Sequence, residues 1–176
     1  MKASTISILK RELNTIAAGD LVDICLKLAK YKKENKELIS YLLFDANNEL
    51  EYISSIKKEI DILFSEINFS QMYFVRKSVR KIFKSTTKYI RYSGQKRTEV
   101  ELLIYFCSKL KTSGIALERN NSLNNLYKNQ IRKIHQVIST LHEDLQYDYM
   151  TELNGLSMKS QNDLKSKIIL PPYQPK

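Results

Sequence analysis

The densest array of charged side chains in the sequence is a row of cations between residues 76 and 91. Four of them recur at every fourth position and three lie beside these, and the full set is Arg76, Lys77, Arg80, Lys81, Lys84, Lys88 and Arg91. No acidic residue lies between Ser70 and Arg97. Residues four apart share one side of a helix, so these cations would present a strip of positive charge to phosphate groups. The row predicts a binding surface for an anionic polymer such as nucleic acid.

The predicted recognition is of a charged backbone and not of a base sequence. Tyr73, Tyr89 and Tyr92 flank the row and could stack on bases or sugars. Like charges four residues apart destabilise an isolated helix by roughly 0.2–0.5 kcal/mol per pair, which an anionic partner would relieve. The alternative interpretation is a solvated face that only keeps a basic protein in solution. A membrane surface is disfavoured because the other side of this segment carries ordinary core residues and the sequence has no lipid anchor.

The charge balance along the chain supports this location. The net charge is +10. Residues 1–68 contain 10 Lys and Arg against 11 Asp and Glu, residues 69–115 contain 11 against 2, and residues 116–176 contain 8 against 6. Nearly all of the positive excess therefore belongs to the middle of the chain.

A second candidate surface is predicted near the C-terminus. Residues 122–153 contain neither Gly nor Pro, and apolar residues recur there at steps of three and four, which predicts one long helix. Its apolar seam would include Ile131, Ile134, Ile138, Leu141 and Leu145. Carboxylates at positions 144, 148 and 152 share another side of this segment. The seam favours a homodimer or a protein–protein adaptor, and this interpretation is kept as the alternative to polyanion binding.

Catalysis and metal binding find little support in the sequence. His135 and His142 lie seven residues apart, about two helical turns or roughly 10 Å, which is too far to chelate one ion. The four isolated glycines form no phosphate-binding loop, and no nucleophile-elbow motif occurs. We therefore predict a non-enzymatic protein with no catalytic residue, no metal, no cofactor and no small-molecule substrate.

These candidate surfaces must be positioned by helices, because hydrophobic spacing of three and four residues dominates the chain. Helices are predicted over about 4–13, 21–31, 37–44, 50–67, 70–92, 98–112 and 122–153. Gly94 is expected to end the fifth of these, and Thr98 with Glu101 forms a capping-box pattern at the start of the sixth. The predicted fold class is all-α, a compact stack of about six or seven amphipathic helices. Both a short α-solenoid of the HEAT or armadillo kind and a helical bundle satisfy the pattern. The absence of a fixed repeat period weakens the solenoid without excluding it, because degenerate repeats can share only their hydrophobic spacing, and the pattern slightly favours the solenoid-like stack.

One domain over residues 1–155 is expected, followed by a polar, Pro-containing and disordered tail over 156–176. The two cysteines, Cys25 and Cys107, fall in apolar stretches and are expected to be buried free thiols. No signal peptide is recognised, and the apolar runs are shorter than the ~20 residues that a membrane-spanning helix needs. The expected location is the cytoplasm.

Three stretches carry a resemblance to other proteins, namely residues 28–38, residues 88–94 together with 98–107, and residues 141–149. In these the chain resembles an uncharacterised all-helical bacterial family of about this length. The resemblance covers most of residues 10–153. It implies a bacterial cytoplasmic protein with a compact helical fold, and it implies no activity, ligand or site residue.

Overall fold

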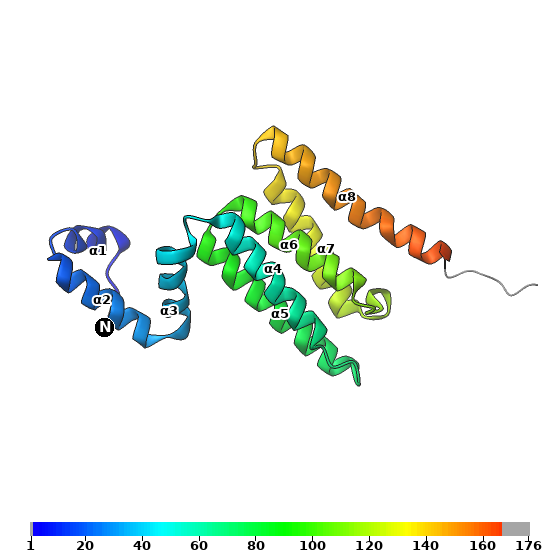
Figure 1. Ribbon diagram of the computed structural model, residues 1–176, viewed down its shortest axis with the longest axis horizontal. Coiled ribbons are helices and arrows are strands. Elements are labelled where there is room, and N and C mark those ends of the chain that lie inside the picture. The colour runs from blue at the N-terminus through cyan, green and yellow to red at the C-terminus, as the bar shows by residue number, and fades with distance from the viewer. Residues whose placement is uncertain (1, 167–176) are drawn as a thin grey trace, which may run out of the picture. The chain divides into compact units, whose positions relative to one another are not determined.

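The computed structural model describes residues 2–166, with side chains for residues 2–156, and every regular element in that part of the chain is helical (Figure 1). The α-helices are α1 (Ile6–Leu13), α2 (Ala18–Tyr31), α3 (Lys33–Ser40), α4 (Glu49–Ser65), α5 (Met72–Ser93), α6 (Lys96–Thr112), α7 (Asn121–Ile138) and α8 (Glu143–Ser166). A π-helical turn, η1 (Tyr41–Asp45), follows α3, and a 3₁₀ turn, η2 (Leu117–Arg119), precedes α7. The all-α prediction is confirmed.

The chain divides into two compact units, Met1–Asn48 and Glu49–Lys176. The sequence predicted a single domain over 1–155, and burial explains the difference. Helices α1, α2 and α3 contain no buried residue, and Tyr41 of η1 is the one buried residue among residues 2–48, so the described part of the N-terminal unit has no core of the usual kind. In the C-terminal unit each of α4, α5, α6 and α7 contributes buried residues.

The C-terminal unit is a helical bundle built around α6. Leu102, Leu103 and Phe106 of α6 are fully buried, and α6 packs against α4, α5, α7 and α8. The ring of Phe106 lies 5.8 Å from that of Phe64 on α4 and 5.4 Å from that of Phe83 on α5. Aromatic contacts at this separation add to the energy of burial. The central position of α6 explains why eight of its residues are buried.

Helix α5 begins and ends close to the predicted limits. Its buried residues recur at steps of three and four, and its C-terminal boundary is at Gly94, whose φ of 67° places it in the left-handed conformation. The Gly94 amide donates to the carbonyl of Ile90, which satisfies one of the free carbonyls at the helix end. The expected role of Gly94 is confirmed.

The capping box predicted at Thr98 and Glu101 does not form. Helix α6 begins two residues earlier, at Lys96 with Gln95 as its N-cap, so Thr98 lies inside the first turn. The buried Thr98 hydroxyl and the Ser93 hydroxyl both donate to the carboxylate of Glu49 at the start of α4. A tertiary hydrogen bond across 49 residues has therefore replaced the local one.

The single long helix predicted over 122–153 is wrong. It is divided into α7 and α8 at residues 139–142. The Ser139 and Thr140 hydroxyls donate to the carbonyls of Gln136 and Val137 at 2.8 and 2.7 Å, so local side-chain bonds compete with the continuation of the helix. This break needs neither Gly nor Pro, which is why their absence misled the prediction. Helix α8 continues to Ser166, past the predicted domain end at 155, and residues 167–176 of the predicted tail lie outside the described residues.

Candidate functional site

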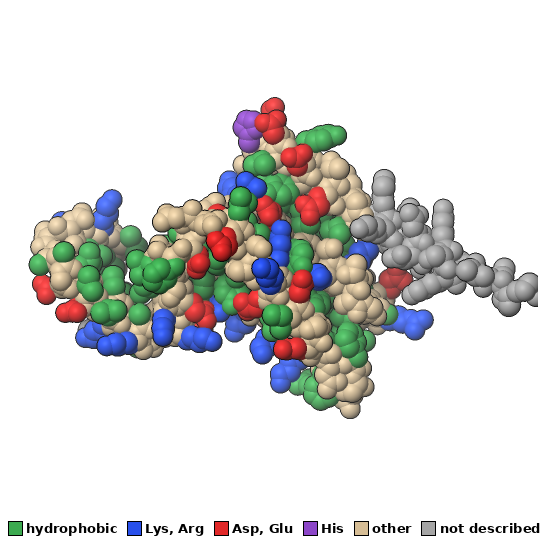
Figure 2. Space-filling view, viewed as in Figure 1, with side chains coloured by type: hydrophobic (Ala, Val, Ile, Leu, Met, Phe, Trp, Pro, Cys, Tyr) green, Lys and Arg blue, Asp and Glu red, His purple; other side chains and the backbone are tan. Residues whose placement is uncertain are grey.

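The cations of α5 occupy the side of the helix opposite to its core side. At 100° per residue, the seven predicted positions fall within a sector of about 140°. The buried residues Val75, Val79, Ile82, Thr86 and Ile90 fall in a separate sector centred roughly opposite. Packing of the apolar side against α4 and α6 therefore fixes which way the basic side faces. We call these cations the basic face of α5, and its members are Arg76, Lys77, Arg80, Lys81, Lys84, Lys88 and Arg91. Figure 2 shows Lys and Arg side chains along the margin of the bundle where α5 runs.

Carboxylates of the chain do not neutralise this face. Among the side chains that the structure describes, six of the seven cations make no ion pair. The seventh, Lys88, has its ammonium 4.6 Å from the ring centroid of Tyr89 and 5.9 Å from that of Tyr92. Four other cations of the bundle do pair with acids, namely Lys57, Arg97, Lys109 and Lys133. The positive charge of α5 is thus uncompensated at the place where the cations are most dense.

Arg80 connects the basic face to α7. Its Nη2 donates to the Ser122 hydroxyl at 2.8 Å, and Ser122 lies in the first turn of α7. This neutral acceptor orients the guanidinium without cancelling its charge. No local pattern predicts this contact, because the two residues are 42 positions apart.

A hollow at the N-terminal end of α5 combines cations with an aromatic ring. Tyr73, Arg76, Lys77 and Arg80 line it, and its volume is about 460 Å³. Tyr73 is 59% exposed, and it lies within the same sector of the helix as the cations. An exposed ring beside guanidinium and ammonium groups provides a stacking surface next to phosphate-binding groups.

The other two tyrosines proposed to stack are engaged elsewhere. The Tyr89 hydroxyl donates to Glu59 on α4 at 2.9 Å, and the Tyr89 and Tyr92 rings contact each other edge to face at 6.1 Å. Both residues are half-buried. Of the three predicted tyrosines, Tyr73 alone is exposed.

The C-terminal end of α5 borders a second hollow, of about 350 Å³. It is lined by Thr87, Ile90, Arg91, Gly94, Gln95, Glu99 and Lys133. The acid in this hollow is Glu99, and its carboxylate pairs with Lys133 of α7 at 2.5 Å and not with Arg91. Arg91 therefore remains available to an anion, and the carboxylate limits how far an anionic chain can extend in this direction.

A network of charged groups stabilises the side of the bundle formed by α4, α6 and α8. The carboxylate of Glu101 accepts from Lys57 at 3.1 Å, from Arg97 at 3.1 Å and from the Tyr149 hydroxyl at 2.9 Å. Burial alone would raise the pKa of Glu101, but these three donors outweigh it and lower that pKa. Burial and the bond to Glu101 raise the pKa of Tyr149 to about 12. These charges are satisfied within the protein, so this side is structural.

A smaller cluster of the same kind lies beside it. Asp61 accepts from the Tyr105 hydroxyl and from Lys109, each at 2.7 Å. Burial acts to raise the pKa of Asp61, yet the bonds from Lys109 and Tyr105 bring it below the usual value. The cluster joins α4 to α6 and leaves no charge uncompensated.

The apolar seam predicted for a protein partner is divided between the core and the surface. Ile134 and Ile138 are buried in the bundle, with exposed fractions of 0% and 2%, and Ile131, Leu141 and Leu145 are half-buried. Because Leu141 lies in the break between α7 and α8, the five residues do not form one continuous stripe. The two central positions pack within the chain and are not accessible to a partner.

The residues considered for catalysis or metal binding lie apart from one another. His135 is exposed on α7, and His142 lies beyond the break, where its Nδ1 is 3.3 Å from Asp144. No group of three His, Cys, Asp or Glu side chains suitable for a metal ion occurs among residues 2–156. Cys107 is buried, which raises its pKa to about 12, whereas Cys25 is exposed, so the expectation of two buried thiols was wrong for Cys25. Cys25 belongs to a helix that buries no residue, and apolar neighbours in sequence were therefore no guide to its burial.

No helix in the described part of the chain is both long and apolar enough to cross a bilayer. A scan against family models, a search of curated proteins and a search of solved structures each give no match.

Proposed function

We propose that this protein is a binding or scaffold protein that contacts the backbone of an anionic polymer, with nucleic acid as the leading class, through the basic face of α5. The observation that carries the proposal is the set of six cations on that face without a carboxylate partner among the described side chains. Four cations elsewhere on the bundle, Lys57, Arg97, Lys109 and Lys133, pair with acids. A face that excludes acids over 140° of a 22-residue helix suits phosphate binding.

Spacing along the helix supports the same conclusion. Arg76, Arg80 and Lys84 lie about 6 Å apart along the helix axis, since four residues rise by 1.5 Å each, and the phosphates of an extended strand have a similar separation. Tyr73 adds a stacking surface at one end of the row. Cations that meet phosphates and a ring that stacks on any base act alike on every sequence, so the binding is expected to be independent of sequence.

The test is a salt titration with a fluorescent single-stranded oligonucleotide. If four to six phosphates are contacted, log K for a single strand falls against log salt with a slope of about −3 to −4. Oligonucleotides of equal length and different sequence should bind equally. Absence of binding at low salt would contradict the proposal.

A variant pair separates a local effect from net charge. Reversal of Arg76, Arg80 and Lys84 to Glu should remove the three central contacts and make the slope shallower by about 2. The matched control reverses Lys2, Lys10 and Lys58, which are exposed and lie outside the basic face. Both variants change the net charge equally, so equal loss of binding in the two would show that the basic face has no special role.

A further inference from the structure

The N-terminal unit carries a surface that the polyanion proposal does not use. Large apolar side chains are exposed along α1 and α2, among them Leu26 at 51%, Leu28 at 52% and Tyr31 at 76%. Figure 2 shows hydrophobic side chains over this unit and Lys side chains along one edge of it. Exposed apolar area of this extent is typical of a surface that another molecule covers.

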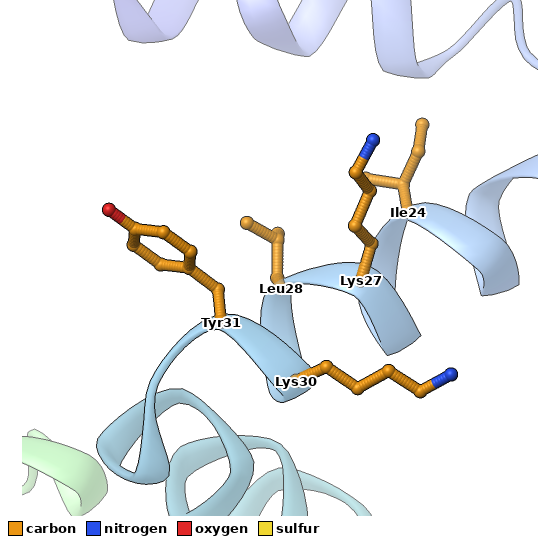
Figure 3. A pocket seen from close by; sticks show the side chains of 5 residues that line it. All are labelled: Ile24, Lys27, Leu28, Lys30 and Tyr31. Carbon is orange, nitrogen blue, oxygen red and sulfur yellow. The ribbon is translucent and has the colours of Figure 1, made fainter.

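Two hollows lie side by side on α2 and α3. One, of about 510 Å³, is lined by Ile24, Lys27, Leu28, Lys30 and Tyr31, and Figure 3 shows Ile24, Leu28 and Tyr31 pointing to the same side of α2. In that view the Lys30 side chain extends away from these three. It also contributes to the second hollow, which is therefore on the neighbouring side of α2.

The second hollow has an apolar floor and a rim of lysines. Its volume is about 570 Å³, and its lining is Leu26, Ala29, Lys30, Lys32, Lys33, Lys36, Ile39 and Ser40. Only Lys33 forms an ion pair among the described residues, with Glu37 at 3.6 Å. No acidic residue lines the hollow. We name it the lysine-rimmed hollow; it is suited to an apolar or aromatic group that is flanked by carboxylates.

Helix α8 presents a group of that kind. Tyr147 is 76% exposed, with Glu143, Asp144 and Asp148 exposed around it. At 100° per residue these four fall within about 140° of one another, on the side away from the buried Tyr149 and Leu153. Apart from the contact between Asp144 and His142, none of these three acids pairs with a cation among residues 2–156. We name these four residues the acidic face of α8.

We propose that the acidic face of α8 of one copy of this chain docks on the lysine-rimmed hollow of a second copy. Tyr147 enters the hollow and contacts its apolar floor, and the carboxylates beside it pair with the lysines of the rim. A buried aromatic anchor surrounded by opposite charges is a recurrent arrangement at the centre of protein interfaces. The choice of a second copy rests on charge complementarity. The same chain carries a hollow lined by lysines with no acidic residue among them, and a helix face whose acids pair with no Lys or Arg among residues 2–156.

The contact joins two different surfaces, so the partners need not bury identical patches. It uses neither the basic face of α5 nor its stacking tyrosine. The proposal is therefore independent of polyanion binding, and either one can fail alone.

A charge-swap experiment by analytical ultracentrifugation tests it. The wild-type chain should associate as its concentration rises from about 1 to 100 µM, and the association should weaken with added salt, since the contact is small and charged. One variant carries Lys30→Glu and Lys36→Glu, and the other carries Asp144→Lys and Asp148→Lys. Each variant alone has like charges on both surfaces and should remain monomeric, with association weakened at least tenfold.

Mixing the two variants gives the decisive result. An acidic hollow then meets a basic α8, and a basic hollow meets an acidic α8, so the mixture should associate although neither variant does so alone. Recovery in the mixture also shows that both variants are folded. A wild-type chain that is monomeric throughout, or a mixture that remains monomeric, would overturn the proposal.

Two further measurements test which group occupies the lysine-rimmed hollow. Tyr147→Ala should weaken association without any change of charge, whereas reversal of Arg76, Arg80 and Lys84 should leave it unchanged. Flotation with vesicles of phosphatidylcholine and phosphatidylglycerol tests a lipid surface as the occupant. Monomeric protein that floats with these vesicles, and loses this property on Lys30→Glu and Lys36→Glu, would assign the hollow to lipid and overturn the proposal.

Discussion

At the scale of single residues, the protein contains two kinds of charged side chain that the sequence does not distinguish. Lys57 and Lys109 pair with half-buried acids, whereas Arg76 and Lys84 have no acid partner among the side chains of residues 2–156. A carboxylate that accepts hydrogen bonds from several charged donors stabilises the fold. Its removal lowers the free energy of unfolding, because partly buried donors are left without an acceptor. Glu101, with three donors from three helices, is the clearest example.

Glu101→Gln should lower the free energy of unfolding at neutral pH by about 1–3 kcal/mol, because Lys57 and Arg97 then lose a charged partner in a half-buried site. Urea denaturation followed by circular dichroism measures this. Glu66→Gln, at an exposed position, is the control and should cost less than about 0.5 kcal/mol.

The difference between wild type and Glu101→Gln should depend on pH. The pKa of Glu101 is lowered in the folded state, so its contribution is complete above the usual value of 4.5 and is lost as the pH falls through the folded value. The two stability curves should therefore converge in acid. A constant difference down to pH 2 would contradict the assigned role of this carboxylate.

At the scale of elements, the sequence predicts a helix boundary correctly where the backbone conformation at that boundary requires a particular residue type. Gly94 was recognised because a left-handed residue ends helices, and such a position has a strong chemical preference. The boundary between α7 and α8 was missed because Ser139 and Thr140 are compatible with both a helix and a break. The decision depends on whether Ile138 and Tyr149 can both be buried, which is a tertiary condition.

Gly94→Ala should destabilise the protein by about 1–2 kcal/mol, the cost of the left-handed conformation for a residue with a side chain. No atom lies within 4 Å of the added methyl group, so no steric clash contributes. Gly155→Ala is a matched control, since Gly155 lies in α8 with equally open surroundings. Alanine there should be neutral or stabilising by up to about 1 kcal/mol, and thermal unfolding of the two variants should give opposite shifts.

At the scale of the whole molecule, the stability is concentrated in the unit that begins at Glu49. Its helices contribute fully buried side chains, while α1, α2 and α3 bury none. Amphipathic helices gain most of their stability from packing, so the N-terminal unit depends on whatever covers it. The same feature makes it available as a docking surface.

A pair of leucine variants measures this asymmetry. Leu103→Ala removes a fully buried side chain at the centre of the bundle and should cost about 2–5 kcal/mol. Leu28→Ala removes a side chain that is half exposed and should cost less than about 1 kcal/mol in dilute, monomeric protein. Equal losses in denaturant unfolding would show that the N-terminal unit contributes a core that its exposure does not reveal.

The sequence by itself determined the helical class, the helix that carries the cations and the side of that helix on which they lie, because these follow from residue spacing along a single helix. Tertiary structure decided which charges remain uncompensated, since Glu101 pairs with Lys57, 44 residues away, and Asp61 pairs with Lys109, 48 residues away. It also decided that Ile134 and Ile138 belong to the core, and that the apolar sides of α1 and α2 remain exposed. Hydrophobic spacing identifies the apolar side of a helix. Which segment packs on that side depends on contacts between residues far apart in the sequence, and local patterns do not encode these contacts.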